Sequence, residues 1–159
     1  MLAWGFNEHG AIARSLVTSH SFSSPYHDAQ VPTAWLGPVY PAIVAVVFLI
    51  FGVQSYASAV AILIFNALCS AATGAVIYEL GKEAHSEKAG WCAAWMWAFS
   101  PSIVIFPLLL WETSLSALLL ATATLLTIRL QSAKTTAWAL CGALWGITAL
   151  LNPALLPRA

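Results

Sequence analysis

The chain alternates long apolar runs with short polar segments, and this pattern is typical of a bundle of membrane helices. Each run is continuous, rich in Ala and Leu, and about 16–25 residues long, whereas barrel strands would alternate apolar and polar positions over about ten residues. The runs cover residues 38–53, Tyr56–Leu80, Ala89–Ile105 (interrupted at Pro101), Glu112–Leu130 and Thr135–Leu151. We therefore expect an all-α fold of polytopic membrane helices.

The first run differs from the other four because it is short. At about 1.5 Å per residue, a helix over residues 38–53 would be about 24 Å long, less than a hydrocarbon core of about 30 Å. A tight turn over residues 52–55 follows it directly. The pattern predicts four full spans plus one short re-entrant or interfacial helix. In the last run, Gly142 and Gly146 form a GxxxG pattern that indicates a helix-packing face.

Residues 1–37 form the longest segment that neither spans the membrane nor makes a short turn. Asn7 can cap a helix whose first turn carries Glu8, where the helix dipole favours an acid. The apolar residues of this helix fall on one stripe: Ile12, Ala13, Leu16 and Val17. The helix is too short to span a bilayer, so we expect it to lie on the membrane surface. The sequence divides into an external juxtamembrane segment (1–37) and a partial transmembrane region (38–159).

Composition agrees with the membrane assignment. Hydrophobic residues make up 60% of the chain and charged residues 8%, and the mean hydropathy is +0.82. A soluble domain of this size could not cover such a surface with polar side chains. The net charge is zero without a basic cluster, so nothing indicates a nucleic-acid partner. The three cysteines are widely spaced inside apolar runs and are interpreted as packing residues.

The basic residues predict the orientation. Lys82 and Lys88 lie in a charged loop predicted over residues 81–88, Arg129 and Lys134 lie in a polar turn over residues 129–134, and an even number of spans separates the two. Both loops are therefore expected on the cytoplasmic side, which places Glu112 outside. Glu8 is cytoplasmic if the run over residues 38–53 crosses the membrane, and external if that run is re-entrant. The shortness of the run favours the external side.

Several motifs, taken in order, resemble a known family. They are NEHGAIARSL, SFSSPYH, PTAWLGPVYPAIVAVVFLIFG, SPSIVIFPLLLWETSL and GALWGITALLNP. Together they are similar to membrane glycosyltransferases of the type C fold, namely the bacterial relatives of dolichyl-phosphate-mannose protein mannosyltransferases and of lipid A aminoarabinose transferases. The resemblance covers nearly the whole chain but only the amino-terminal third of such an enzyme, so we interpret the chain as a fragment that is inactive alone.

The resemblance implies transfer of a sugar from a polyprenyl phosphate to a protein, lipid or glycan acceptor outside the cytoplasmic (inner) membrane. The family places its catalytic acid at the start of the surface helix, often as an Asp–Glu pair. Here that pair reads Asn7–Glu8, so Glu8 is the carboxylate that matches. A second external acid of the family matches Glu112.

The chemistry assigns roles to these residues. Transfer from a lipid phosphate needs a base for the acceptor proton and a positive group, a metal or Lys/Arg, for the leaving phosphate. Glu8 is the candidate base, and Glu112 could orient the acceptor or help to hold a divalent metal. The candidate substrate-binding residues are Arg14, as the external cation, and Trp35 and Tyr40, as a border for the isoprenoid tail. No metal-ligand set is visible, so the cofactor is left open.

Two other classes stay open. A polytopic transporter would carry ionisable residues near the bilayer midplane and often two repeated halves. Neither feature is visible in the sequence, which favours the enzyme. A non-catalytic membrane protein of the same family is the third interpretation, and Asn7 in place of an acid keeps it open.

Overall fold

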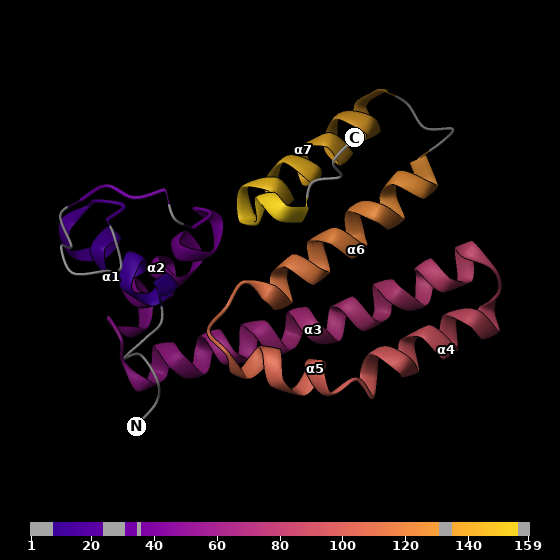
Figure 1. Ribbon diagram of the computed structural model, residues 1–159, viewed down its shortest axis with the longest axis horizontal. Helices are drawn as coiled ribbons and strands as arrows, with labels where there is room; N and C mark the ends of the chain where they lie inside the picture. Colours follow the sequence, from indigo (N-terminus) through magenta and orange to yellow (C-terminus); the bar gives the residue numbers. More distant parts are fainter. Residues whose placement is uncertain (1–7, 24–30, 35, 131–134, 156–159) are drawn as a thin grey trace.

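The computed structural model describes residues 8–23, 31–34, 36–130 and 135–155, and within these residues the fold is all-helical (Figure 1). The elements in chain order are α1 (Glu8–Ser19), α2 (Val39–Phe51), α3 (Tyr56–Ala84), α4 (Glu87–Ala98), α5 (Pro101–Ile105), η2 (Phe106–Leu108), α6 (Thr113–Arg129), α7 (Thr135–Leu151) and η4 (Pro153–Leu155). The described part contains one isolated antiparallel bridge, Ser23 to Pro32, and no strand. The expectation of an all-α fold is confirmed.

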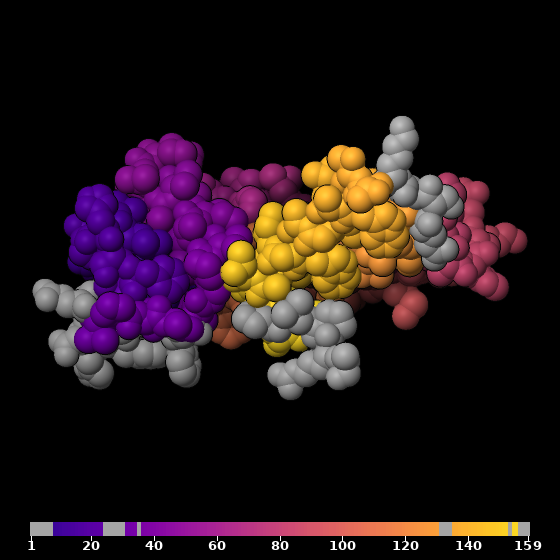
Figure 2. Space-filling view, turned by 90° about the horizontal axis from the view of Figure 1, so that it is seen from above, coloured from indigo at the N-terminus to yellow at the C-terminus, as the bar shows by residue number. Residues whose placement is uncertain are grey.

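The long helix α3 is the axis of the molecule. Helices α4 and α6 both pack along it, α7 packs on α6, and α1 and α2 pack on each other beside the first turns of α3 (Figure 1). Seen from above, the α1–α2 pair forms one end of an elongated molecule and α7 covers the middle of the visible face (Figure 2). The amino-terminal ends of α3 and α6 therefore lie toward the α1–α2 end.

The amphipathic stripe predicted for the first helix is the surface that it buries. Ile12 and Ala13 are fully buried, and Leu16 and Val17 pack against the core. The main apolar partners of this stripe come from the buried face of α2, namely Tyr40, Val44, Ala45 and Phe48. The turn after α2 is also as predicted: Gly52 has φ +92°, a conformation that residues with a Cβ rarely adopt.

The predicted charged loop over residues 81–88 is wrong for its first half. Helix α3 continues to Ala84, and the loop is reduced to the two residues before Glu87. A close approach of α3 and α4 explains the difference: a Cβ on Gly81 would lie 2.8 Å from Gly90 Cα, and one on Gly90 would lie 2.5 Å from the Tyr78 carbonyl oxygen. Two glycines face each other, so the helices cross almost in backbone contact and α3 stays helical through its charged residues.

One helix in the described residues, α3 with 29 residues, is long and apolar enough to cross a membrane. Helix α4 and the segment Pro101–Leu108 pass the same criterion only together, with a bend of 55° between them, where Pro101 interrupts the run as predicted. Helices α2, α6 and α7 are shorter apolar helices of 13, 17 and 17 residues. Four full spans are therefore not confirmed, because most of the apolar helices are near or below the length of a span.

A cluster of charges joins the carboxyl ends of α3 and α6. Arg129 Nε donates to Glu83 Oε1 at 2.9 Å, and its Nη2 donates to Glu79. All three side chains are partly exposed to a similar degree. The carboxyl ends of α3 and α6, each of which precedes a basic loop of the sequence, therefore lie side by side.

The GxxxG pattern of α7 has no partner within the described part of the chain. A Cβ on Gly142 or on Gly146 would meet no atom within 4 Å. Helix α7 instead packs on α6 through another side, where Cys141 and Thr148 are buried. The predicted packing face is thus not used by the described residues.

Candidate functional site

A buried histidine and a carboxylate connect the first and sixth helices. His9, in the first turn of α1, is 5% exposed, and its Nε2 lies 2.7 Å from Glu112 Oε2 at the start of α6. The two residues are 103 positions apart in sequence, so the fold alone brings them together. A short contact between an imidazole and a carboxylate is characteristic of a charge-assisted hydrogen bond.

A buried amide on the apolar helix α3 forms hydrogen bonds with two segments that lie next to this pair. Asn66 is fully buried; its Nδ2 donates to the Leu109 carbonyl oxygen and to Tyr40 Oη, both at 3.0 Å, and its Oδ1 lies 3.2 Å from Tyr40 Oη. The Tyr40 ring meets the His9 ring edge-on, with centroids 5.0 Å apart. These contacts connect α3, α2 and α1 in turn, and the His9–Glu112 contact leads on to the start of α6. The segment before α6, which carries Leu109, returns to Asn66 and closes the ring.

Three buried polar atoms in the described residues have no hydrogen-bond partner, and they belong to this region. They are His9 Nδ1, Ser114 Oγ and Ser116 Oγ. The two serines are on the first turn of α6, within four residues of Glu112. Because unpaired buried polar groups are costly and rare, such a concentration needs an explanation, and a binding or catalytic role is a common one.

The hydrogen bond from His9 lowers the pKa of the Glu112 carboxyl below its usual value, and a backbone hydrogen bond acts in the same direction. Partial burial opposes this effect but does not reverse it. Glu112 is therefore an ionised acceptor, so the Nε2 atom of His9 carries the hydrogen and donates it. In a neutral imidazole this leaves Nδ1 as an acceptor with a free lone pair.

Acid pH is expected to weaken the fold through this carboxylate. Because its folded-state pKa lies below the ordinary value of 4.5, Glu112 contributes stability above that value and loses the contribution as the pH falls through the folded pKa. The unfolding temperature of the chain in nanodiscs, measured from pH 7 to about pH 3, reports this loss.

The Glu112→Gln variant is expected to lose less stability than the wild type over the acid part of that series. Glu87→Gln is the matched control, since Glu87 is exposed in the first turn of α4. An acid transition that is the same in Glu112→Gln and in the wild type would contradict the role of this carboxylate.

The structure places the other candidate residues as follows. Glu8 is half-buried at the first position of α1, next to His9, so both candidate acids lie at the junction of α1 and α6. Arg14 lies on the exposed side of α1. Tyr40 is 1% exposed and packs in the core, hydrogen-bonded to Asn66. Trp35 lies outside the described residues.

No group of three or more His, Cys, Asp or Glu side chains gathers within the described ranges in a way that could hold a metal ion. Glu112 has a histidine as its neighbour, but a pair is fewer ligands than a structural or catalytic metal site uses. The described residues alone therefore do not define a metal centre.

The sequence interpretation missed His9 and Asn66. His9 directly follows the acid that drew attention to the segment, but nothing local indicates that its ring turns toward α6. Asn66 carried a usable signal, because an amide in the middle of an apolar run is costly unless it is hydrogen-bonded or functional.

Fold and site together define an all-helical protein of apolar helices, with a buried polar cluster where α1, α2 and α3 meet the start of α6. The family model described as dolichyl-phosphate-mannose-protein mannosyltransferase matches residues 32–154 of the chain. The chain belongs to this family of membrane glycosyltransferases, as its motifs led us to expect. The match includes Tyr40, Asn66 and Glu112, whereas α1 precedes it. No curated protein and no solved structure matches the chain.

Proposed function

We propose that this protein takes part in the transfer of a sugar from a polyprenyl phosphate to an acceptor hydroxyl at the outer surface of the cytoplasmic membrane. The family supports a mannosyltransferase-like reaction, because its description names a lipid-linked mannose as donor. The observation that carries the proposal is the buried His9–Glu112 pair, with unpaired polar atoms on both sides of it.

The reaction needs one proton acceptor and one leaving group. The acceptor oxygen forms a bond to the anomeric carbon of the sugar, the bond from that carbon to the phosphate oxygen breaks, and the polyprenyl phosphate leaves with the electron pair. The acceptor proton passes to Glu8, the candidate base at the start of α1. Glu112, which is ionised and oriented by His9, accepts a hydrogen bond from the acceptor or the sugar and fixes its position.

The remaining candidate residues are assigned to binding of the lipid-linked donor. Arg14 is the exposed cation on α1 and would meet the phosphate from the membrane surface. Tyr40 would act from within the core, through the His9 ring that it contacts, and Trp35 would contact the isoprenoid chain. A divalent metal held by substrate phosphate and one carboxylate would serve the same purpose as Arg14.

The outer side of the membrane is supported by the charge distribution. Arg129, with Glu79 and Glu83, lies at the ends of α3 and α6 that precede the basic loops, and basic loops face the cytoplasm. Glu112 lies at the opposite end of α6. In this orientation both candidate acids are external, together with α1, and the chain contributes several membrane spans to a multi-pass enzyme.

Transfer is tested directly in proteoliposomes that contain the full-length protein and a polyprenyl phosphate carrying radiolabelled mannose. We expect the label to leave the lipid fraction and appear on an added protein, lipid or glycan acceptor, faster than in liposomes without the protein. Label that stays on the lipid at the background rate with every acceptor would contradict the proposed function.

A further inference from the structure

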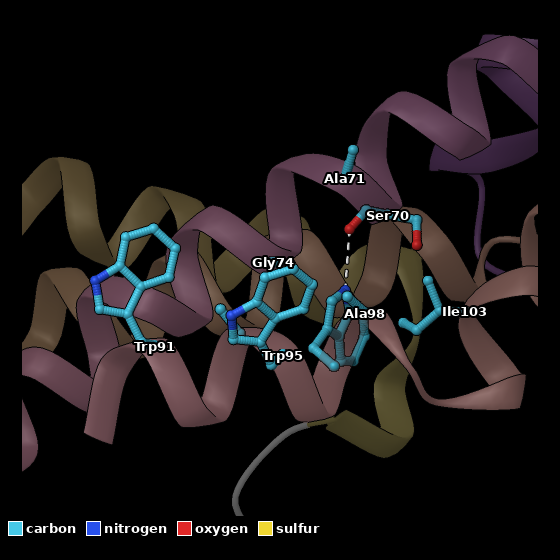
Figure 3. Close-up of a pocket in the computed structure, with 9 residues that line it drawn as sticks. Ser70, Ala71, Gly74, Trp91, Trp95, Ala98 and Ile103 are labelled. Carbon is cyan, nitrogen blue, oxygen red and sulfur yellow. Dashed lines mark hydrogen bonds between the residues drawn. The ribbon is translucent and has the colours of Figure 1, made fainter. Parts of the chain in front are cut away.

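An apolar groove between α3 and α4 is open to the surroundings of the protein. It has a volume of about 340 Å³ and is lined mainly by apolar groups, including those of Ala71, Gly74, Trp91, Trp95 and Trp97 (Figure 3). Trp91 and Trp95 follow each other along α4 and are about half exposed, so their indoles form an open wall. Trp97 Nε1 donates to the Ser70 carbonyl oxygen at 3.1 Å. Gly74 leaves room for this third indole, since a Cβ there would lie 3.2 Å from Trp97 Cδ1.

Two lysines lie where this groove meets the turn between α3 and α4. The ring centroid of Trp91 lies 5.0 Å from that of Tyr78, and Lys82 Nζ lies 5.9 Å from the Tyr78 centroid, within reach of a cation–π contact. Lys88 precedes Trp91 by three residues on α4, so the two share one face of that helix. Tyr78, Lys82, Lys88 and Trp91 together form the lysine–aromatic patch. The patch joins two cations to the apolar wall of the groove.

The lysine–aromatic patch carries a net positive charge. Two acids of this end of the molecule, Glu79 and Glu83, pair with Arg129 of α6. Neither lysine of the patch forms an ion pair within the described part of the chain. Glu87 is exposed at the same turn, so two lysines stand against one glutamate. The single positive charge that remains complements one phosphate group.

The patch lies at the depth of lipid headgroups. Helix α3 has no charged residue from its start to Tyr78, and Glu79 follows directly. This uncharged part is close to the about 20 residues that cross a hydrocarbon core, so Lys82 lies just beyond the hydrocarbon. Helix α4 returns from the turn along α3, and Trp95 is about 6 Å farther along it than Trp91. The groove therefore leads from the headgroup level into the hydrocarbon.

We propose that this surface binds one anionic phospholipid, with its phosphate beside the two lysines of the patch and one acyl chain along Trp91 and Trp95. The carboxyl end of α3 precedes a basic loop, which places the lipid in the cytoplasmic leaflet. The His9–Glu112 pair lies at the start of α6, away from this end, so the lipid is separate from the substrates of the proposed function. Because it contacts both α3 and α4, it makes their packing depend on the lipid composition of the membrane.

The test is photolabelling of the full-length protein in nanodiscs made of phosphatidylcholine. Two probes carry the same diazirine in the same acyl chain and differ only in the headgroup, which is phosphatidylglycerol or phosphatidylcholine. We expect the phosphatidylglycerol probe to label the peptides of α3 and α4 that line the groove roughly tenfold more, because the lysines attract an anionic headgroup and not a zwitterionic one. Equal labelling by the two probes would overturn the proposal, since the indoles would then contact any membrane lipid.

The double variant Lys82→Gln, Lys88→Gln is expected to bring the ratio of the two probes close to one. Labelling by the phosphatidylcholine probe is expected to persist, which shows that α3 and α4 still pack. The matched control is Lys82→Arg, Lys88→Arg, which keeps both charges and is expected to hold the ratio within about twofold of the wild type. A glutamine variant with the wild-type ratio would contradict the role of the lysines.

The place of the acyl chain is tested with a second pair of variants. Ala71→Trp fills the groove with an indole and is expected to lower labelling by both probes. Ala72→Trp is the control, because Ala72 is the next residue of α3, is also exposed, and does not line the groove. Labelling that is equal in these two variants would overturn the assignment of the groove. None of these measurements requires sugar transfer.

Discussion

Replacing Glu112 by glutamine is expected to slow sugar transfer roughly 100- to 1,000-fold, within the range that a single acid–base or orienting group contributes. Glutamine has nearly the same shape and can still accept a hydrogen bond from His9 Nε2 through its amide oxygen. The variant therefore keeps the contact between α1 and α6 but removes the negative charge. The measurement is the initial rate of label transfer by the full-length protein in proteoliposomes, at equal amounts of folded protein.

Two variants make this result specific. Glu87→Gln removes an exposed carboxylate from the first turn of α4 and is expected to leave the rate unchanged. Glu8→Gln is expected to lower the rate as well, since Glu8 is the candidate base. A rate within about twofold of the wild type for Glu112→Gln would exclude an essential role for this charge, whatever the result for Glu8.

Replacing Asn66 by leucine is expected to cost roughly 2 kcal/mol of stability, because it leaves the buried Tyr40 hydroxyl and the Leu109 carbonyl oxygen without their hydrogen bonds. Leucine has about the same volume, so the change removes the bonds without opening a large cavity. The Leu109 carbonyl oxygen and Tyr40 Oη would lose the amide that they share. The change is measured as the shift of the unfolding midpoint in nanodiscs or in mixed micelles.

The control for Asn66→Leu is Thr73→Val on the same helix. Thr73 is as buried as Asn66, but its Oγ1 donates to the Cys69 carbonyl oxygen of its own helix. Removing this hydrogen bond therefore breaks no contact between α3 and another segment. We expect Thr73→Val to cost clearly less and to leave transfer unchanged. If both variants cost the same, Asn66 is an ordinary polar residue of the helix and does not hold the ring of contacts.

The parts of the fold that depend on local pattern could be predicted from the sequence. Continuous apolar runs gave the helices and most of their bounds, the stripe through Ile12 and Ala13 gave the buried face of α1, and Pro101 gave the break after α4. In each case the signal and the structure involve the same few neighbouring residues. Local periodicity is sufficient there because it is the property that the packing uses.

The parts that depend on distant partners could not be predicted. The charged residues after Gly81 indicate a loop, but contact with Gly90 keeps α3 helical to Ala84. The contact of His9 with Glu112 spans 103 positions, and a single sequence holds no pattern for such a pair. Asn66 was visible as an amide in an apolar run, but its partners on two other segments were not.

The unequal lengths of the helices make the protein sensitive to hydrophobic mismatch. Helix α3 has 29 residues and is about 43 Å long, whereas α6 has 17 and is about 25 Å long. Arg129 pairs with Glu79 and Glu83 at the carboxyl ends of the two helices, so the difference in length falls at their amino-terminal ends. A bilayer that suits α6 is thinner than the usual hydrocarbon core of about 30 Å, and α3 then has to tilt. A change in bilayer thickness would therefore be accommodated at the end of α6 that carries Glu112.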